Sequence, residues 1–407
     1  MSALCARLSS ASRPSSPLAA HSGSRRVLTA LVARLRGAGA MVRGRISRLL
    51  VRDVRFPTSL GGHGSDAMHA DPDYSAAYVV IETDAEDGLK GYGITFTLGK
   101  GTEVAWSREG RGAPGNSSHP KCSVGLVGQA GGKACLEVTR GHEEQMLAQG
   151  YPAYTTSCAW LGYSDDTLKQ LCTQALKDGW TRFKVKVGAD LQDDERRCQL
   201  IRDVIGPEKT LMMDANQRWD VPEAVEWMSK LAKFKPLWIE EPTSPDDILG
   251  HATISKALVP LGIGVATGEQ CHNRVIFKQL LQAKALQFLQ IDSCRLGSIN
   301  ENLSVLLMAK KFEIPVCPHA GGVGLCELVQ HLIIFDYISV SASLKNRMCE
   351  YVDHLHEHFK YPVMIQQASY MPPKDAGYST EMKEESVKKH QYPDGDVWKK
   401  LLAAQEN

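Results

Sequence analysis

The sequence lacks several features that would place it in other classes of protein. It has no run of about 18 apolar residues, the length that a membrane span requires, and none of its eleven cysteines forms a C-x-x-C pair. We therefore expect reduced, buried thiols rather than a disulfide scaffold or a zinc knuckle. The formal net charge of the 407 residues is only +1, which argues against nucleic acid as the main partner. With 43% hydrophobic residues, the chain can form one large domain and a smaller one.

Acidic residues are missing from the N-terminal part of the chain, where the first acid is Asp53. Residues 1–40 combine this absence with many serines and alanines and with six arginines, at positions 7, 13, 25, 26, 34 and 36. An arginine-rich, serine-rich and acid-free segment is typical of a mitochondrial transit peptide. The sequence therefore predicts a mitochondrial protein with a targeting extension. The alternative is an untargeted, disordered tail, with Met41 as the functional start and a cytoplasmic location.

Residues 41–104 have the pattern of a small β unit. Three β-rich stretches, 45–56, 74–83 and 91–98, are separated by turn signals, and this spacing predicts a three-stranded antiparallel meander. The connection between the first two stretches, residues 61–73, is polar and rich in glycine. It is either a mobile surface loop or a lid over a substrate, and its length favours the lid.

Residues 105–142 do not follow this pattern. They contain eight glycines and keep neither helical nor strand periodicity for more than a few residues. We predict that this segment is disordered, so that the small N-terminal domain around it is incomplete.

From residue 143 to residue 353, strand-like apolar stretches alternate with segments of helical period. The eight strands are expected at 152–157, 182–187, 211–214, 237–240, 262–267, 287–291, 314–318 and 347–352. The seven connecting helices are expected from the N-cap Ser164, over 191–205, from Pro222, and over 246–258, 273–283, 299–311 and 323–335. This alternation predicts an α/β fold, a modified TIM barrel of the form (β/α)7β. An open, doubly wound sheet is the structural alternative.

Charged or ionisable residues lie at the carboxyl ends of seven successive predicted strands. They are Lys184 with Lys186, Asp214, Glu240, Glu269, Asp292, His319 and Glu350. Because the carboxyl ends of parallel strands meet on one face, we expect these side chains to converge. Asp214, Glu240 and Glu269 are hard oxygen donors, and we expect them to hold Mg²⁺. Glu241 points away from Glu240 in an extended strand, so it is left out of the expected site.

The residues around this metal suggest proton abstraction. Lys184 and Lys186 lie two apart in one strand, and each is expected to lower the pKa of the other, so that one can act as a base. Across the barrel, Asp292 can orient His319 as an acid or base. This arrangement suits removal of a proton α to a carboxylate, with stabilisation of the resulting enolate.

These motifs resemble those of a known family. The resemblance rests on K-V-K at 184–186, D-A-N at 214–216, W-I-E-E-P at 238–242, G-E at 268–269, Asp292 and His319. They resemble the mandelate-racemase-like branch of the enolase superfamily. The stretches YPAYTTSCAWLGYSDD, GADLQDD and CPHAGGVGLCE are similar to those of the L-fuconate dehydratases within it. The resemblance covers residues 41–104 and 143–407.

The resemblance implies a Mg²⁺-dependent hydro-lyase that converts an acid sugar such as L-fuconate to a 2-keto-3-deoxy sugar acid. Lys186 would remove the C2 proton and Lys184 would lie beside the substrate carboxylate. His319, backed by Asp292, would protonate the leaving 3-hydroxyl. Substrate contacts are further implied for Glu350, Gly64, Ser65, Asp66 and Tyr74. Residues 354–407 would pack on the small capping domain.

Several alternatives stay open. Bases on both faces of a substrate would also permit racemisation or epimerisation of a 2-hydroxy acid. Family members carry a longer helical cap segment in place of residues 105–142, so the chain is alternatively an impaired variant that binds other proteins or RNA. His354, His356 and His358 form either a metal tract or, as we expect, a solvated segment. The expected partner is a small sugar acid, a homo-oligomer is an open alternative, and a membrane is not expected.

Overall fold

The structure is a computed structural model that describes residues 45–69, 72–86, 88–99, 132–375 and 377–405, with backbone alone for 132–139 and 405. The predictions for residues 1–40 and 105–131 lie outside the described residues. Among the described residues, 45–48, 82–86 and 88–90 belong to one compact unit, and the others belong to a second, which contains all the predicted site residues.

The N-terminal sheet has three strands in the order β1-β2-β3. They are β1 (Ile46–Phe56), β2 (Tyr74–Thr83) and β3 (Lys90–Leu98), and the 3-10 helix η1 (Thr58–Gly61) follows β1. These bounds lie within one residue of the stretches expected from the sequence. Buried side chains on one face of the strands include Val54, Ala76 and Phe96, so this face belongs to the main apolar core.

Helix α3 (Gly132–Gln149) corrects the expectation that residues 105–142 lack regular structure, because residues 132–142 are its first part. Glycine content disfavours a helix here, but tertiary contacts override that propensity. Met146 is only 1% exposed, Tyr337 donates a hydrogen bond to Gln145, and the rings of His142 and Tyr337 lie 4.8 Å apart. A local stretch of sequence contains no information about the Gln145–Tyr337 contact, whose residues are 192 positions apart.

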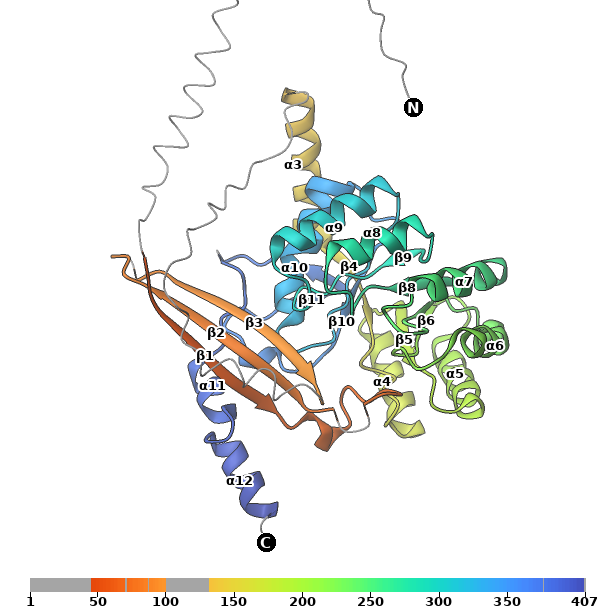
Figure 1. Cartoon of the computed structure of the whole chain (residues 1–407), viewed down its shortest axis with the longest axis horizontal. Helices are drawn as coiled ribbons and strands as arrows, with labels where there is room; N and C mark the ends of the chain where they lie inside the picture. Colours follow the sequence, from red (N-terminus) through yellow and green to blue (C-terminus); the bar gives the residue numbers. More distant parts are fainter. Residues whose placement is uncertain (1–44, 70–71, 87, 100–131, 376, 406–407) are drawn as a thin grey trace, which may run out of the picture. The chain divides into compact units, whose positions relative to one another are not determined.

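The central sheet is parallel. Its strands are β4 (Tyr151–Thr155), β5 (Arg182–Lys186), β6 (Thr210–Asp214), β7 (Trp238–Glu240), β8 (Gly264–Thr267), β9 (Phe288–Leu289) and β10 (Cys349–Tyr351). They pair in the order of the chain from β4 to β9, and β10 pairs with the other side of β4. The α/β class is therefore confirmed. Figure 1 shows helices of the same stretch of chain around these strands.

The seventh expected strand, 314–318, is not a named strand in the structure. Its extended backbone makes one isolated bridge, between Leu289 and Val316. Hydrogen bonds nevertheless connect it on both sides, because Cys317 N donates to Leu289 O and Glu350 N donates to Pro318 O. The two prolines of this segment, Pro315 and Pro318, have no N–H to donate, which limits a regular ladder.

The helices that follow the strands are α4 (Asp165–Lys177), α5 (Leu191–Ile205), α6 (Val221–Leu231), α7 (Ile248–Leu258), α8 (Arg274–Gln282), α9 (Ile299–Lys311) and α10 (Leu325–Phe335). Short turns extend three of them: η2 (Ala232–Phe234), η3 (Val259–Leu261) and the π-helical η4 (Asp336–Ser341). Local residues explain where two of these helices, α4 and α6, begin. Ser164 accepts a hydrogen bond from Thr167 N as N-cap, and Pro222 lies in the first turn of α6, both as expected.

The C-terminal segment contains η5 (His356–His358), β11 (Met364–Gln366), β12 (Ser369–Met371), α11 (Glu384–His390) and α12 (Asp396–Gln405). β12 pairs antiparallel with β4, beside the parallel sheet. Helix α12 and the turn before it reach the N-terminal sheet: Trp398 Nε1 donates to Arg55 O at 3.0 Å, and Tyr392 N donates to Asp53 O at 2.9 Å.

The three histidines of this segment have separate surroundings. His356 Nδ1 lies 2.7 Å from Glu327, His358 Nδ1 lies 3.1 Å from Ser386 Oγ, and the ring of His354 stacks on that of His63. Each histidine thus has a protein neighbour of its own.

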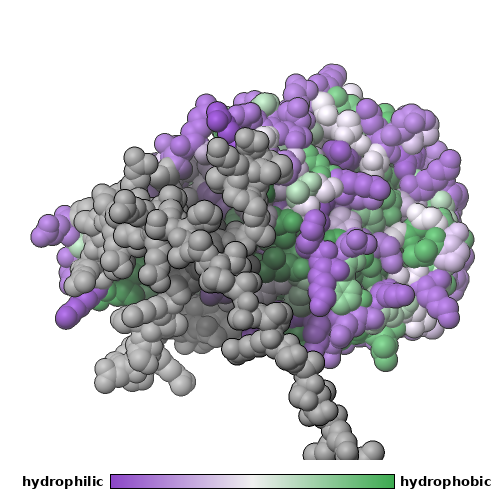
Figure 2. All heavy atoms as spheres, turned by 90° about the horizontal axis from the view of Figure 1, so that it is seen from above, coloured by the Kyte–Doolittle hydropathy of each residue, from purple (hydrophilic) through white to green (hydrophobic). Residues whose placement is uncertain are grey.

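Within the described residues, no helix is long and apolar enough to cross a membrane. On the face drawn in Figure 2, hydrophilic side chains surround small apolar areas.

Candidate active site

The site lies one layer above an apolar floor. The floor consists of Tyr154, Met212, Trp238, Ala266, Phe288, Cys317 and Met348, a cluster to which nearly every parallel strand contributes one side chain. Successive residues of a strand alternate between its two faces, so a residue two positions further on points the same way. Five of these floor residues are followed, two positions later in the chain, by a polar residue. These polar residues are Thr156, Asp214, Glu240, His319 and Glu350. The strand period therefore brings these polar groups together.

Lys184 joins three of the predicted acids. Its Nζ lies 2.6 Å from Glu240 Oε1, 2.8 Å from Glu350 Oε1 and 3.2 Å from Asp214 Oδ2. Lys186 Nζ lies 2.6 Å from the same Asp214 oxygen and donates to Asn216 Oδ1 at 3.0 Å. All of these side chains are buried, so both lysines and their partners form one water-poor cluster.

The charge of Lys184 does lower the pKa of Lys186, as expected, but the expected net lowering, which would let one lysine act as a base, is wrong for this arrangement. Burial does lower the pKa of Lys184, but the charges of Glu240 and Glu350 outweigh burial and raise it well above the ordinary value. For Lys186, burial is likewise outweighed, here by Asp214, and the pKa is raised. Acids outnumber ammonium groups around the pair, and this excess decides the direction of the shift. Both lysines are therefore protonated in this state of the protein.

His319 has the geometry of an oriented imidazole. Its Nδ1 lies 2.8 Å from Asp292 Oδ2, while Nε2 lies 3.5 Å from Glu269 Oε2 and 3.6 Å from Glu350 Oε2. Burial lowers the pKa of His319, but the charges of Glu269 and Glu350 and the hydrogen bond to Asp292 outweigh it, so the pKa is raised. The ring is thus held in place by Asp292 and favours the protonated form, which suits a proton donor.

Arg295 is a site residue that the sequence analysis missed. It is ion-paired with Asp292, and its Nη1 lies 3.4 Å from Glu269 Oε1. Asp292 also accepts hydrogen bonds from the backbone N–H groups of Cys294 and Arg295. The feature of the sequence that could have identified Arg295 is its place three positions after Asp292. The chain turns there, so a basic side chain can fold back on the carboxylate.

Phe96 was also missed, because it lies in β3 and no polar motif marks it. Its ring packs against the His319 ring with centroids 6.4 Å apart, and the Arg295 guanidinium lies 5.0 Å from its centroid. A Cβ at Gly322 would lie 2.4 Å from Phe96, so any other residue here requires the ring to shift. The N-terminal sheet therefore supplies an apolar cover to the histidine side of the site.

Glu241 belongs to the same cluster, against expectation. Strand β7 ends at Glu240, and a φ of +41° at Glu241 breaks the alternation that would have turned it away. Burial, with the charges of Glu269 and Asp214, raises the pKa of Glu241 well above its usual range. Its Oε1 is buried and has no hydrogen-bond partner among the described residues, while Oε2 accepts from Gln217 at 2.6 Å.

The donor set fits a hard divalent cation by charge and element. The described part of the cluster contains six carboxylates, of Asp214, Glu240, Glu241, Glu269, Asp292 and Glu350, against three permanent cations, of Lys184, Lys186 and Arg295. Burial and the charge of Asp214, opposed by Lys184, raise the pKa of Glu240 to about 8. An unpartnered buried carboxylate oxygen and an excess of negative charge are what a bound cation would offset.

The three expected ligands do not, however, form a ready-made metal site. Within the described residues, no group of three or more His, Cys, Asp or Glu side chains is arranged to hold a metal ion. The reason lies in the ion pairs: Lys184 engages Glu240 and Asp214, and Arg295 lies beside Glu269. These basic side chains compensate the carboxylates that were expected to share an ion.

The expected substrate contacts in the loop after β1 have local partners. Ser65 Oγ donates to Gly62 O and accepts from Gly162 N, and Asp66 accepts from the backbone N–H groups of Met68 and His69. Gly64 lies against Tyr74, whose hydroxyl would be 2.8 Å from an added Cβ. Burial and the charges of Glu350 and Asp66 raise the pKa of Tyr74, which places its ring near the site. Ser65 and Asp66 thus hold the loop's shape.

The fold and this arrangement of strand-end residues define a class of protein. The chain belongs to the enolase superfamily: residues 167–386 match the family described as enolase C-terminal domain-like. Mitochondrial enolase superfamily member 1 of Homo sapiens is 71% identical, in an alignment that covers 90% of this chain and 100% of the relative. That alignment spans 451 positions, more than the 407 residues of the chain, so the relative has residues without a counterpart here.

Other relatives are named as dehydratases. L-galactonate dehydratase of Hypocrea jecorina is 42% identical over 84% of this chain and 93% of the relative. The crystal structure of the human mitochondrial enolase superfamily member 1 has a TM-score of 0.80 and 70% identity, over 89% of this chain and 100% of that chain. L-talarate/galactarate dehydratase of Salmonella typhimurium, solved with Mg and L-lyxarohydroxamate, has a TM-score of 0.64 at 20% identity, over 86% and 93% of the two chains. This last likeness concerns the fold alone.

Proposed function

We propose that this chain is a Mg²⁺-dependent hydro-lyase that dehydrates a sugar acid to a 2-keto-3-deoxy sugar acid. The observation that carries the proposal is the cluster in which Lys184 and Lys186 lie among carboxylates while His319 approaches the same Glu350 from the other end of the sheet. A lysine and an oriented imidazole near shared acids can remove one proton and deliver another. The 42% identity to a named L-galactonate dehydratase supports the same reaction class.

Each residue has a role that follows from its contacts. Lys186, the more exposed lysine at 6%, is positioned to remove the C2 proton, while the fully enclosed Lys184 lies where it can neutralise the substrate carboxylate. His319 donates a proton from Nε2 to the leaving 3-hydroxyl, with Asp292 holding Nδ1. Glu350 lies beside Lys184 through Oε1 and beside His319 Nε2 through Oε2. Tyr74 and Phe96, from the N-terminal sheet, cover the site.

Asp214, Glu240 and Glu269 would hold Mg²⁺, with Glu241 as a further carboxylate nearby. When bound, the ion supplies charge stabilisation to the enolate oxygens. Lys184 and Arg295 must then release carboxylates with which they now pair. Lys186 would lose part of the negative charge that raises its pKa, which favours its service as a base.

The substrate is tested with two sugar acids that differ at one atom. L-fuconate is L-galactonate without its 6-hydroxyl, so the two compounds share the stereochemistry at which the reaction occurs. We expect Mg²⁺-dependent formation of a 2-keto-3-deoxy acid from both, measured by a carbonyl-specific assay and mass spectrometry. Absence of product from both compounds at millimolar concentration, with Mg²⁺ bound, would exclude this substrate class.

Racemisation or epimerisation is the second candidate, because Lys186 and His319 both carry transferable protons. Incubation in deuterium oxide separates the two reactions. A dehydratase gives a product that lacks one water and carries deuterium at C3, taken up when the enol becomes the 2-keto acid, whereas a racemase gives starting material of inverted configuration with deuterium at C2. A third candidate, a binding role with impaired turnover, is supported by the residues that the human relative has and this chain lacks.

The mitochondrial location is also a proposal. It is supported by the arginine-rich, acid-free residues 1–40 and by the names of relatives in three mammals, Homo sapiens, Pongo abelii and Bos taurus. Import of the full chain into isolated mitochondria, with and without a membrane potential, tests it. A chain that stays accessible to added protease would contradict mitochondrial import.

A further inference from the structure

A cavity of about 320 Å³ lies on the outer side of β4 and β10, away from the acid and lysine cluster. Its walls come from α4, from the residues after β4 and β10, and from the turn between β11 and β12. Glu350 points to Lys184, so the next residue of the strand, Tyr351, points outward and lines the cavity. The cavity is therefore separate from the proposed active site.

The topology explains why space remains here. Each earlier parallel strand is followed by a helix, but after β10 the described chain makes only the short turn η5 before the β11–β12 hairpin. The hairpin covers β4 by pairing with it through β12, and Gln367 in its turn approaches Gly179 at the end of α4. A two-stranded hairpin is thinner than a helix with its side chains, so part of the volume that a helix would take is left open.

The lining has a distinctive chemistry. Of the described residues that line the cavity, two carry charge, Asp178 and Asp353, and none is lysine, arginine or histidine. Trp180 and Tyr351 add aromatic rings, stacked with centroids 5.5 Å apart, and Trp180 is only 8% exposed. Two carboxylates beside aromatic surface, with no lysine or arginine among the described lining residues, favour a positively charged guest.

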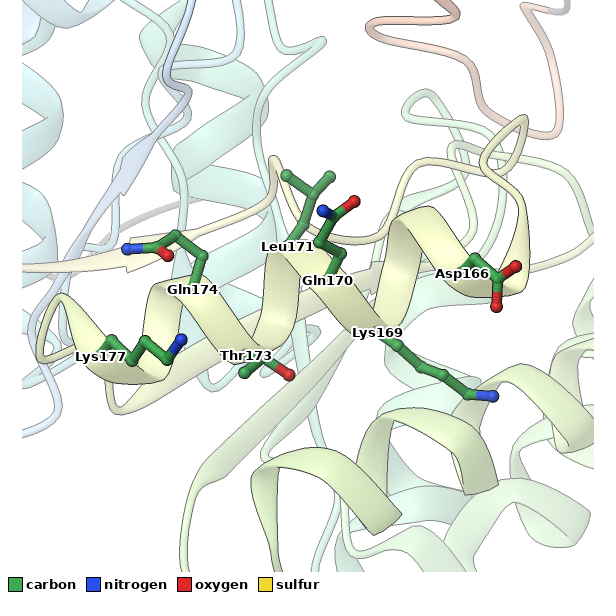
Figure 3. A pocket seen from close by; sticks show the side chains of 7 residues that line it. All are labelled: Asp166, Lys169, Gln170, Leu171, Thr173, Gln174 and Lys177. Atoms are coloured by element: carbon green, nitrogen blue, oxygen red, sulfur yellow. The ribbon is translucent and has the colours of Figure 1, made fainter.

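A hollow on the same helix serves as a contrast. It runs along the exposed side of α4 and is lined by Asp166, Lys169, Gln170, Leu171, Thr173, Gln174 and Lys177, as Figure 3 shows. Its single acid is balanced by two lysines, and all seven residues belong to one helix. It has neither the aromatic wall nor the charge of the cavity beside it.

We propose that the cavity between α4 and the β11–β12 hairpin binds a small organic cation, a quaternary or protonated amine. The volume is at the small end of that of ligand sites, which restricts the guest to a few heavy atoms. The ammonium group lies between the carboxylates of Asp178 and Asp353, and its alkyl groups lie against Trp180. Asp353 Oδ1 also lies 3.9 Å from His354 Nδ1, so this ring faces the same carboxylate as the guest.

The test compares choline with 3,3-dimethyl-1-butanol, which has the same shape but carbon in place of the charged nitrogen. Both are titrated into the full chain at constant ionic strength, with tryptophan fluorescence and calorimetry as readouts. We expect saturable choline binding, and binding of the uncharged compound weaker by at least about fivefold. Trp180→Phe removes the fluorescence change while calorimetry still detects choline. Equal binding of the two compounds, or no choline binding at tens of millimolar, overturns the proposal.

Three further variants locate the site. Asp178→Asn and Asp353→Asn each weaken choline binding by about two- to fivefold, because both carboxylates are exposed to solvent. The double variant weakens it more than either single variant does. Asp166→Asn, on the same helix but in the other hollow, leaves the affinity unchanged. Thermal melts confirm that all variants are folded. An affinity unchanged in the folded double variant, or lowered equally by Asp166→Asn, contradicts this location.

Discussion

Nζ of Lys184 lies 2.6 Å from Oε1 of Glu240, and neither side chain is exposed to solvent. A buried ion pair is costly to break, because the remaining charge has neither water nor partner. The pair also stands where a metal ion and a substrate carboxylate are proposed to bind. The same contact therefore affects the stability of the protein without metal and its rearrangement when metal enters.

Replacing Lys184 by Met tests the stability contribution of the pair. We expect Lys184→Met to lower the free energy of unfolding in metal-free buffer by about 3 kcal/mol, near the low end for a broken buried pair, because Glu240 can take up a proton. Urea unfolding measures the effect. The exposed pair of Lys230 and Glu226 supplies the control, since Lys230→Met should cost about 0.5 kcal/mol or less. Equal losses in the two variants would show that burial of Lys184 has no energetic weight.

Magnesium should stabilise the folded chain through the carboxylates. At about 100 times its dissociation constant, a ligand that binds only the folded state adds about 2.7 kcal/mol. We expect Mg²⁺ to raise the melting temperature of the wild type and not that of Asp214→Asn. Asp193→Asn, which changes an exposed acid in the first turn of α5, should keep the wild-type response. The same Mg²⁺ response in Asp214→Asn would remove this residue from the metal site.

His319 and Lys186 should fail at different steps. His319→Asn is expected to lower dehydration by about 10²–10⁴-fold, the usual contribution of one acid or base. Exchange of the C2 proton with deuterium oxide should survive in this variant, because Lys186 still removes it. Lys186→Met should lose both reactions. Loss of exchange in His319→Asn would mean that the histidine, not the lysine, removes the proton.

Gly322 and Phe96 should be energetically coupled. The methyl group of Gly322→Ala would lie 2.4 Å from the Phe96 ring, and such overpacking costs about 1–3 kcal/mol. Phe96→Ala removes the ring, so the double variant should lose less stability than the sum of the losses in the two single variants. Urea unfolding of the four proteins in this cycle gives the coupling. Strict additivity would indicate that the ring moves aside at no cost.

His358 should make stability depend on pH below neutrality. Its ring packs 4.6 Å from that of Phe56 and 4.8 Å from that of His390. Burial, helped by His390 and opposed by Glu357, lowers the pKa of His358 from 6.5 to about 4. The unfolded chain then binds more protons between these values, so this contribution is complete above pH 6.5 and is lost as the pH falls toward about 4.

The variant His358→Gln isolates this contribution. Denaturant unfolding of the wild type and the variant from pH 8 to pH 4 should give curves that converge as the pH falls, because the variant has no proton to take up at this position. Parallel curves would assign the acid sensitivity to other groups, such as His390, whose pKa is also lowered by burial.

Much of the fold could be predicted from local pattern. The helical period placed α5 and α9 at the observed bounds, and the strand that ends in Asp214 was expected one residue short of its observed start. The segment 314–318 was expected as a strand, but its prolines and its neighbours leave a single bridge. Helix α3 was not expected, because its stability depends on Tyr337, far away in the chain.

The sequence by itself determined the order of chemical groups around the sheet, because strand period and the parallel topology oblige Lys186, Asp214, Glu240, His319 and Glu350 to face one side. Only the tertiary structure decided their charge states and partners. The surrounding acids raise the pKa values of both lysines, and Arg295 and Phe96 lie against the site. The Glu241 side chain lies in the cluster as well. The physical reason is that electrostatic energy depends on distances and burial between residues remote in the chain, whereas periodicity reports only the direction of each side chain.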